Sequence, residues 1–263
     1  MTEFIGTQNA VALQRRLQAR QATIAANPDL VNGGRILHFL DPDKTGWDNV
    51  RAFAQEDRLA GFAVMDRQKA VDLVHSHLGA EWKTPAWRVF IGGQDPVLSA
   101  CTAAIDKIQL PDGWSFTFHD CPSDEEIAQV QALNEATGVS PYPAYYMRSE
   151  AVPVLTTCIR DASGVLMAAA SVADRYHTDC RLAHHAFAGM VSVSERMQGR
   201  GIGKVVNALA LRESHARFGW THATEQAAQD NPASAAMVTA CGLDHSQDLW
   251  TVVAINSGES FSR

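Results

Sequence analysis

The chain has 263 residues, of which 46% are hydrophobic and 19% are charged, a composition typical of a globular protein with one large domain or two small ones. Its formal net charge of −7 argues against a nucleic-acid-binding body, which would carry a basic stripe. Its first residues lack the apolar segment of a secretory signal, and its apolar stretches fall short of the ~20 residues that span a bilayer. We therefore expect a cytoplasmic protein that binds neither nucleic acid nor membrane.

The cysteines predict neither a disulfide framework nor a metal site. Their number is odd, they are widely scattered, and no pair has the CxxC spacing of a zinc site. We expect buried thiols at all five positions, which are Cys101, Cys121, Cys158, Cys180 and Cys241.

The pattern of residues 1–112 predicts an N-terminal α/β module in which helices and strands alternate. Helices are predicted over 8–26, 47–55, 66–79 and 95–108, and strands within 33–43, 59–66 and 86–93. The module shows no catalytic pattern, so its role is unassigned. The segment "QLPDGW" at 109–114 predicts a linker, because Pro-Asp-Gly punctuates the chain.

Residues 113–263 predict a second domain with a mixed sheet. Ser123 and Glu126 form the pattern of a capping box that begins a helix over 121–138. Further helices are expected over 203–217 and 231–242, and strands at 114–119, within 152–176, and at 184–194, 221–228 and 248–255. An antiparallel meander combined with a crossover helix favours a mixed α/β sheet flanked by helices.

The segment "QGRGIGKVVNALAL" at 198–211 joins a glycine-rich turn to a helix, but it fits neither common nucleotide motif. A Walker A loop would need glycine at Gln198 and Ser or Thr at Val205. A dinucleotide fingerprint would need glycine at Lys204. The segment therefore matches neither of these two motifs.

The same segment does match the pattern Q/R-x-x-G-x-G/A through Gln198, Gly201 and Gly203. Glycines allow a tight turn in which successive amides converge, and the following helix adds the positive end of its dipole. This arrangement suits a pyrophosphate, although a glycine-rich turn without a ligand would show the same sequence pattern. Nearby positive charge comes from Arg196, Arg200 and Lys204.

The surroundings of the loop extend this pattern to residues 114–255. A strand ends at Val191–Val193 directly before it, and "NPASAAMVTACGL" follows with Asn231, Ser234 and Gly242. The combination resembles the GNAT superfamily of acyl-CoA-dependent N-acetyltransferases, whose mixed sheet is mostly antiparallel.

The resemblance implies acetyl-CoA as co-substrate and direct transfer of the acetyl group to an amine without a metal. It implies that Val191 and Val193 contact pantetheine through their main chain and that Asn231 lies beside the same arm. The pyrophosphate would be held by Gln198, Gly199, Arg200, Gly201, Ile202, Gly203 and Lys204.

The sequence departs from the family at the positions that handle protons. Val238 stands where many members carry a tyrosine that protonates the thiolate, and Phe187 stands where some carry a glutamate base. His185 and Glu225 are candidate bases, although either could equally be a strand residue without a catalytic role. We expect Cys241 to be a buried structural thiol rather than a nucleophile.

The loop "SPYPAYY" supplies three tyrosines to the region where the family often builds its acceptor site. They could line that site or simply pack against one another, and they are Tyr142, Tyr145 and Tyr146.

We therefore expect an N-acetyltransferase acting on a primary amine of a small molecule or peptide, as a monomer or homodimer. A catalytically silent acyl-CoA-binding or sensing protein on the same fold is the alternative. The N-terminal module could be a degenerate copy of the fold that covers the acceptor site, or a dimer interface.

Overall fold

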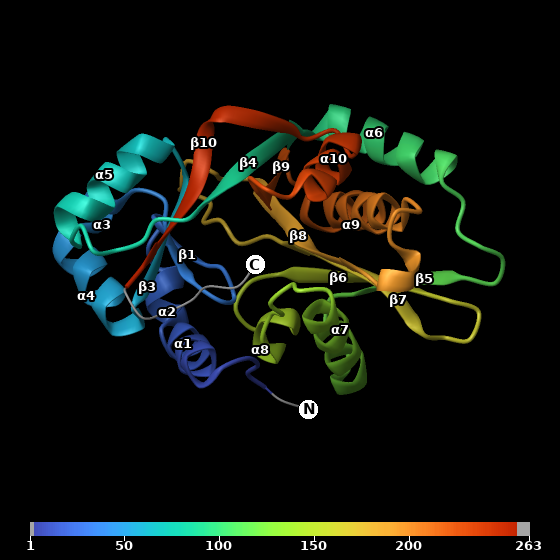
Figure 1. Ribbon diagram of the computed structural model, residues 1–263, viewed down its shortest axis with the longest axis horizontal. Helices are drawn as coiled ribbons and strands as arrows, with labels where there is room; N and C mark the ends of the chain where they lie inside the picture. The colour runs from blue at the N-terminus through green and yellow to red at the C-terminus, as the bar shows by residue number, and fades with distance from the viewer. Residues whose placement is uncertain (1–2, 257–263) are drawn as a thin grey trace.

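A computed structural model describes residues 3–256, which are built around one continuous sheet of ten strands (Figure 1). The strands are β1 Leu30–Asn32, β2 Leu37–Phe39, β3 Leu59–Met65, β4 Ala86–Gly93, β5 Ser115–His119, β6 Val154–Arg160, β7 Leu166–Ala173, β8 His185–Val193, β9 His222–Ala228 and β10 Asp244–Ile255. Their spatial order is β1-β2-β3-β10-β4-β9-β8-β7-β6-β5. Two neighbouring pairs, β2 with β3 and β8 with β9, are parallel, while the other pairs are antiparallel. The predicted mixed, mostly antiparallel sheet is confirmed.

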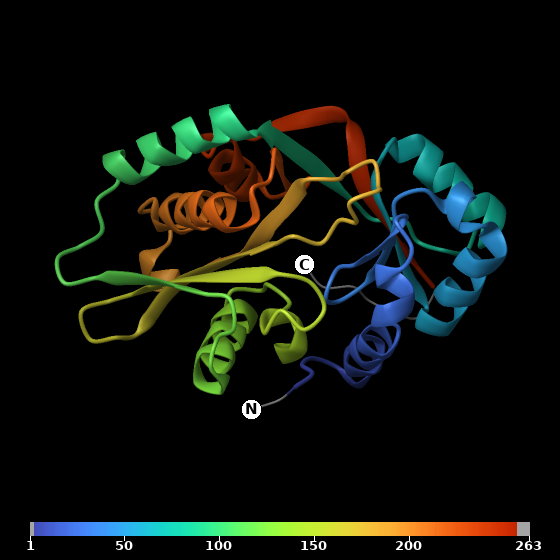
Figure 2. The ribbon, with the colours of Figure 1, turned by 180° about the vertical axis from the view of Figure 1, so that it is seen from behind.

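Helices cover both faces of the sheet. They are α1 Gln8–Ala19, α2 Gln21–Ala25, α3 Pro42–Thr45, α4 Trp47–Asp57, α5 Arg67–His77, α6 Gln94–Lys107, α7 Asp124–Ala136, α8 Ala144–Met147, α9 Ile202–Phe218 and α10 Pro232–Ala240, with a 3-10 turn at Glu195–Met197. Over the C-terminal half, α6, α9 and α10 lie on one face and α7 and α8 on the other (Figures 1 and 2). The helices α1 to α5 surround the other end of the sheet.

Local sequence accounts for most of these elements. The capping box predicted at Ser123 and Glu126 is present at the start of α7, with both reciprocal hydrogen bonds formed. The helix predicted over 8–26 is instead two helices, because the backbone at Arg20 leaves helical geometry. Three short elements were not predicted, the strand β1 and the helices α3 and α8, and all are too brief to show a period.

The two halves of the chain share strands. Strand β4 belongs to residues 1–112 but pairs with β9 on one side and β10 on the other. Strand β10 in turn pairs with β3, so Val252 lies opposite Phe62 and Ile255 opposite Leu59. The predicted boundary near residue 112 falls in the loop between α6 and β5. A division into domains at that loop stays a prediction, since the sheet runs through both parts.

Two hydrophobic cores each contain elements from both halves of the chain. One core joins α6, α9 and α10 to the C-terminal strands, and Val97 and Cys101 of α6 are fully buried in it. A second core joins α1, α4 and α5 to β3 and takes in Val252 and Val253 of β10. Each half therefore completes the core of the other.

Four of the five cysteines are buried, as expected, and Cys121 is exposed. Cys121 lies in the loop before the cap of α7, where the chain has left the sheet and faces solvent. Cys241 is fully buried at the end of α10, as predicted for a structural thiol. No helix within residues 3–256 combines the length and the apolar character needed to cross a membrane.

Candidate active site

The candidate site lies where strands β8 and β9 part. The two strands pair in parallel over three residues, and the pairing ends with Phe187 opposite Thr224. Beyond that point β8 stays paired with β7, while β9 stays paired with β4. The register of β8 against β7 shifts between Ala169 and Ser171, and Met190 has a φ of 55°. This β-bulge bends β8, and a wedge opens between it and β9.

The backbone of β8 beyond the bulge turns polar groups into this wedge. The amide of Ser194 donates to the carbonyl of Met167 on β7, so the adjacent Val193 sits where the antiparallel ladder makes no bond to β7. Its amide and carbonyl therefore face the side of β9. Gln198 Nε2 donates to that carbonyl at 3.1 Å, and Val191 lines the wedge. The edge can offer backbone groups to an extended ligand.

The glycine loop ends at the start of α9. Gly201 has a φ of 84° and stands at the N-cap, and within the described chain no side chain hydrogen-bonds to this cap. The amides of Lys204 and Val205 donate to the carbonyl of Gly201. The amides of Ile202 and Gly203 precede these bonds and point out of the helix end, as the first amides of any helix do. The start of α9 is therefore suited to an anion.

The side chains of the loop divide into two groups. Gln198 and Arg200 are exposed and Lys204 is half-buried, so these polar groups can reach a ligand. Ile202 is buried, and only its amide faces the loop. Arg196 is held by Asp161, with Nη2 at 3.1 Å from Oδ2, so part of its charge is already neutralised. The positive charge that the sequence predicted around the loop is therefore carried mainly by Arg200 and Lys204.

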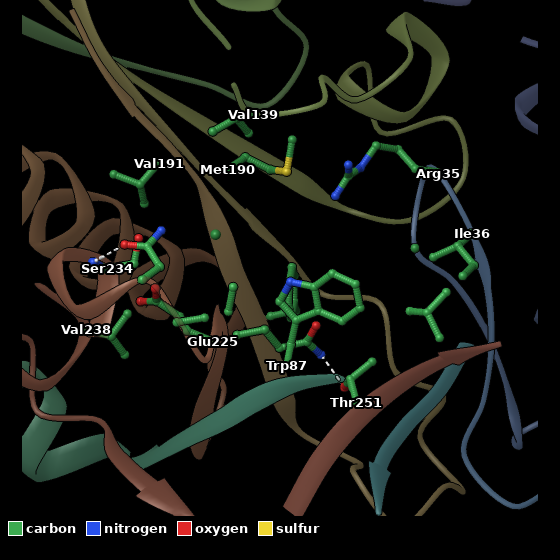
Figure 3. A pocket seen from close by; sticks show the side chains of 18 of the residues that line it. Arg35, Ile36, Trp87, Val139, Met190, Val191, Glu225, Ser234, Val238 and Thr251 are labelled. Carbon is green, nitrogen blue, oxygen red and sulfur yellow. Dashed lines mark hydrogen bonds between the residues drawn. The ribbon is translucent and has the colours of Figure 1, made fainter. Parts of the chain in front are cut away.

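A cavity of about 170 Å³ fills the wedge. Its walls come from β8, β9 and α10 together with the β1–β2 hairpin and Trp87 of β4 (Figure 3). Glu225, Val191, Ser234 and Val238 point into one end of the cavity, and Arg35 points in from the opposite end. Both halves of the chain therefore build this site.

Known structures share this architecture, although no family model and no curated protein sequence matches the chain. A tandem GNAT protein from the clavulanic acid biosynthesis pathway, solved without acetyl-CoA, is 16% identical at a TM-score of 0.58, with 93% of this chain and 89% of that one covered. A GCN5-related N-acetyltransferase from Kribbella flavida is 16% identical at 0.56, with 95% and 98% covered. A GCN5-related N-acetyltransferase-like protein from Streptococcus suis is 13% identical at 0.54, with 93% and 99% covered.

The chain has the GNAT fold. The match to the tandem GNAT protein covers 93% of the chain and so runs through most of residues 1–112. This extent supports the interpretation of the N-terminal module as a degenerate copy of the same fold. The wedge between β8 and β9 lies beside Val191 and Val193, which the sequence resemblance places against pantetheine.

Glu225 is the predicted base that this GNAT fold brings into the cavity. Its side chain is 2% exposed, and Asn207 Nδ2 of α9 donates to Oε1 at 2.6 Å. Burial raises the pKa of Glu225 to about 7, although the hydrogen bond from Asn207 opposes the shift. A carboxyl group with this pKa can hold or release a proton near neutral pH.

His185 does not join Glu225. It lies at the paired end of β8, opposite His222, and it is not among the residues that line the cavity. Its ring stacks on His222 with centroids 4.8 Å apart, and Nδ1 lies 3.1 Å from the carbonyl of Ala183. Burial lowers the pKa of His185. Phe187, which lines the cavity, lies between His185 and the point where the strands part.

The three tyrosines pack in one hydrophobic cluster, and all are buried. The rings of Tyr142 and Tyr146 have centroids 4.7 Å apart, and Tyr146 donates its hydroxyl to the carbonyl of Asn32. The segment predicted as a loop contains α8, which carries Tyr145 and Tyr146. Tyr142 also lines the cavity, so a role in an acceptor site stays a prediction for this residue.

Helix α10 brings Asn231 and Val238 to the cavity wall. Asn231 Oδ1 accepts the amide of Ser234 at 3.0 Å, so this residue caps the helix. Val238 is 1% exposed and lines the cavity. The position that carries a tyrosine in many family members therefore faces the site here as an aliphatic side chain.

Sequence reasoning missed the polar residues at the far end of the cavity. Arg35 lies in the β1–β2 hairpin, His38 in β2 and Arg175 in the segment between β7 and β8. Trp87 of β4 lines the same cavity. The available signal was weak: Arg35 is a single charged residue between Gly33–Gly34 and the apolar run that begins at Ile36. Nothing in the sequence near Arg35 points to residues 187–238.

Proposed function

We propose that the protein is an acetyl-CoA-dependent N-acetyltransferase that transfers an acetyl group directly to a primary amine. The observation that carries this proposal is the arrangement of three features along α9, which lies beside Val193 of β8 at Gly203 and bonds Glu225 of β9 through Asn207. They are the side-chain-free start of α9 at Gly201, the open backbone edge of β8 at Val193, and the buried carboxyl group of Glu225.

The described residues fit the elongated, anionic shape of acetyl-CoA. The φ of 84° at Gly201 favours glycine, and an added Cβ would lie 2.9 Å from Cδ1 of Ile108, so the helix start carries no side chain of its own that would block a pyrophosphate. Arg200 and Lys204 add charge at the same place. Val191 and Val193 would then hold pantetheine through their backbone, and Asn231 would flank that arm from α10.

The bound co-substrate supplies the activated acetyl group as a thioester. A primary amine is mostly protonated near neutral pH and must lose one proton before its nitrogen can attack. Glu225 is the group that accepts this proton, directly or through a water molecule, at a carboxylate oxygen. Asn207 holds the carboxyl group in place through its hydrogen bond to Oε1.

The remaining charge changes fall on the backbone and on the leaving group. Backbone amides along the open edge of β8 would stabilise the negative charge that develops on the carbonyl oxygen. Val238 has no proton to give to the departing sulfur. Tyr142 is the tyrosine of the described chain that lines the cavity, and burial raises its pKa, so it keeps its proton near neutral pH.

A second candidate is a protein that binds acyl-CoA without catalysing transfer. The aliphatic Val238 at the cavity wall favours it, because the usual proton donor is absent from that position. Both candidates need the loop at 198–204, so the loop alone does not separate them.

The test is release of free CoA from acetyl-CoA in the presence of a mixed panel of primary amines, followed with a thiol reagent. Amine-dependent release is the result expected for the acetyltransferase. Calorimetric binding of acetyl-CoA without release by any amine would favour the sensing protein, and absence of binding would contradict both.

Other properties stay predictions. We infer that the acceptor is a small-molecule or peptide amine and that neither nucleic acid nor membrane takes part. A cytoplasmic location and a monomeric or homodimeric state are likewise predicted. Residues 3–256 contain no cluster of three His, Cys, Asp or Glu side chains able to hold a metal ion, and transfer without a metal also stays a prediction.

A further inference from the structure

The far end of the cavity carries positive charge. Arg35 and Arg175 both line it together with His38, whose pKa is lowered first by burial and then by the charges of Arg175 and Arg35. Within the described residues, Glu225 is the only acidic side chain that lines the same cavity, and it points in from the end opposite Arg35 (Figure 3). The cavity is therefore polarised, with a carboxyl group at one end and two guanidinium groups at the other.

Arg175 is buried without an acidic partner. It is 6% exposed, and its guanidinium lies over the ring of Phe187, 3.5 Å from the ring centroid. Nη2 reaches the hydroxyl of Tyr176 at 3.4 Å, and Nε has no hydrogen-bond partner among residues 3–256. A buried charge with unused donors is costly unless a ligand satisfies it.

The position of Arg175 also indicates the shape of that ligand. The contact with Phe187 holds the guanidinium at the cavity wall, where its planar set of N–H donors can meet a ligand. A planar carboxylate accepts two such bonds side by side, and this paired geometry is stronger than two separate neutral hydrogen bonds. The cavity volume of about 170 Å³ suits a ligand of amino-acid size.

We propose that the acceptor is an amino acid or a similar small amine with a carboxylate, which Arg175 binds with the help of Arg35 while the amine faces Glu225. This inference rests on the proposed acetyltransferase function and names its substrate class. A second cavity of about 740 Å³ also has Arg35 and Val139 in its wall, so it adjoins the end of the first cavity that lies away from Glu225.

The first test compares each acid with its own neutral derivative. The panel contains the twenty standard amino acids, β-alanine and γ-aminobutyrate, each beside its carboxamide, with O-phosphoethanolamine as an amine that carries phosphate. We expect at least one acid to be acetylated with a kcat/KM about 100-fold or more above that of its amide, because the amide leaves the buried guanidinium unsatisfied. The best acid should also raise the midpoint of thermal unfolding without acetyl-CoA, and its amide should not.

Three results of this comparison would overturn the inference. Acetylation of amides as fast as acids, preference for O-phosphoethanolamine, or acetylation of other amines but of no acid would each contradict it. In all three outcomes an amine is acetylated, so they differ from failure of the proposed function, in which no amine is acetylated whether or not acetyl-CoA binds.

A variant then assigns the carboxylate to Arg175. In Arg175→Met, kcat/KM for the best acid should fall about 100-fold, while the lower rate with its amide and the affinity for acetyl-CoA stay unchanged. Arg51→Met is the matched control, since Arg51 lies on the surface of α4 in a pair with Asp48. An equal loss with acid and amide would show that Arg175 is structural. If Arg175→Met does not fold, the comparison of acids with amides in the wild type still decides.

Discussion

The chain contains two strand–turn–helix units with opposite chemistry at the turn. In the C-terminal unit, β8 leads through the glycine loop to α9, whose N-cap is Gly201 without a side-chain cap from the described residues. In the N-terminal unit, β3 leads directly to α5, and Asp66 caps that helix by accepting the amide of Lys69 at 2.7 Å. A carboxylate already occupies the helix start that would otherwise attract an anion.

The surroundings of the two helices differ as well. Strands β8 and β9, which flank α9 in the chain, are neighbours that part to form the cavity. Strands β3 and β4, which flank α5, are kept apart by β10, which pairs with both. The N-terminal unit therefore has neither an open helix start nor a wedge. The comparison teaches that the proposed ligand site lies in the unit whose turn and strand pairing both stay open.

The largest expected effect is on the chemistry of the open unit. Glu225→Gln should lower kcat by about 10²–10⁴-fold, the usual contribution of a general base, while acetyl-CoA binds as in the wild type. In the wild type, kcat should rise with pH through about 7, because Glu225 must be deprotonated to accept a proton.

The control is Glu213→Gln, since Glu213 lies on the outer side of α9 and pairs with Arg217. Steady-state rates across pH 5–9 make the measurement. A Glu225→Gln enzyme with the wild-type rate and pH profile would remove Glu225 from the mechanism.

The next effect concerns stability and follows from the same carboxyl group. Burial raises the pKa of Glu225 from 4.5 to about 7 in the folded protein, so the unfolded chain releases this proton first as pH rises. The contribution of Glu225 to the free energy of unfolding therefore falls by about 3 kcal/mol between pH 4.5 and 7. Above pH 7 it stays at this lower value.

Glu225→Gln keeps the shape without the charge, so its stability relative to the wild type should increase with pH over that interval. Urea unfolding of both proteins at pH 5 and pH 8 measures the difference. A gap between the two proteins that is the same at both pH values would contradict the buried, shifted carboxyl group.

The smallest effect tests the closed unit. Asp66→Ala removes the cap of α5 and should lower the free energy of unfolding by about 1 kcal/mol. We expect no acetyl-CoA binding at α5 as a result, because β10 still fills the space between β3 and β4. Asp48→Ala in the exposed first turn of α4 serves as the control. A second acetyl-CoA site in Asp66→Ala would mean that the cap alone had suppressed it.

The parts of the site that depend on local sequence patterns were predictable. The strand before residue 194, the glycine turn, the helix after it and the carboxyl group of Glu225 all belong to short stretches with a period or a motif. Their chemistry is set by neighbours within a few residues, which a sequence shows directly.

The parts that depend on distant pairing were not predictable. Arg35 reaches the cavity because β4 and β10 join the two halves into one sheet, and no local pattern encodes that exchange. Tyr145 and Tyr146 lie in the core because α8 is a single turn, too short to show a period. His185 lies outside the cavity because β8 and β9 are still paired at that residue, and no local pattern shows where the two strands part.

The most direct test of the account is a calorimetric titration of acetyl-CoA into the wild type, Gly201→Glu and Gly164→Glu. Both glycines have a φ of 84°, but Gly164 lies in the turn between β6 and β7, where an added Cβ meets nothing within 4 Å. The account predicts binding by the wild type and Gly164→Glu, and none by Gly201→Glu, whose carboxylate would stand at the start of α9. Binding by all three proteins, or by none, would contradict the assignment of this loop to acetyl-CoA.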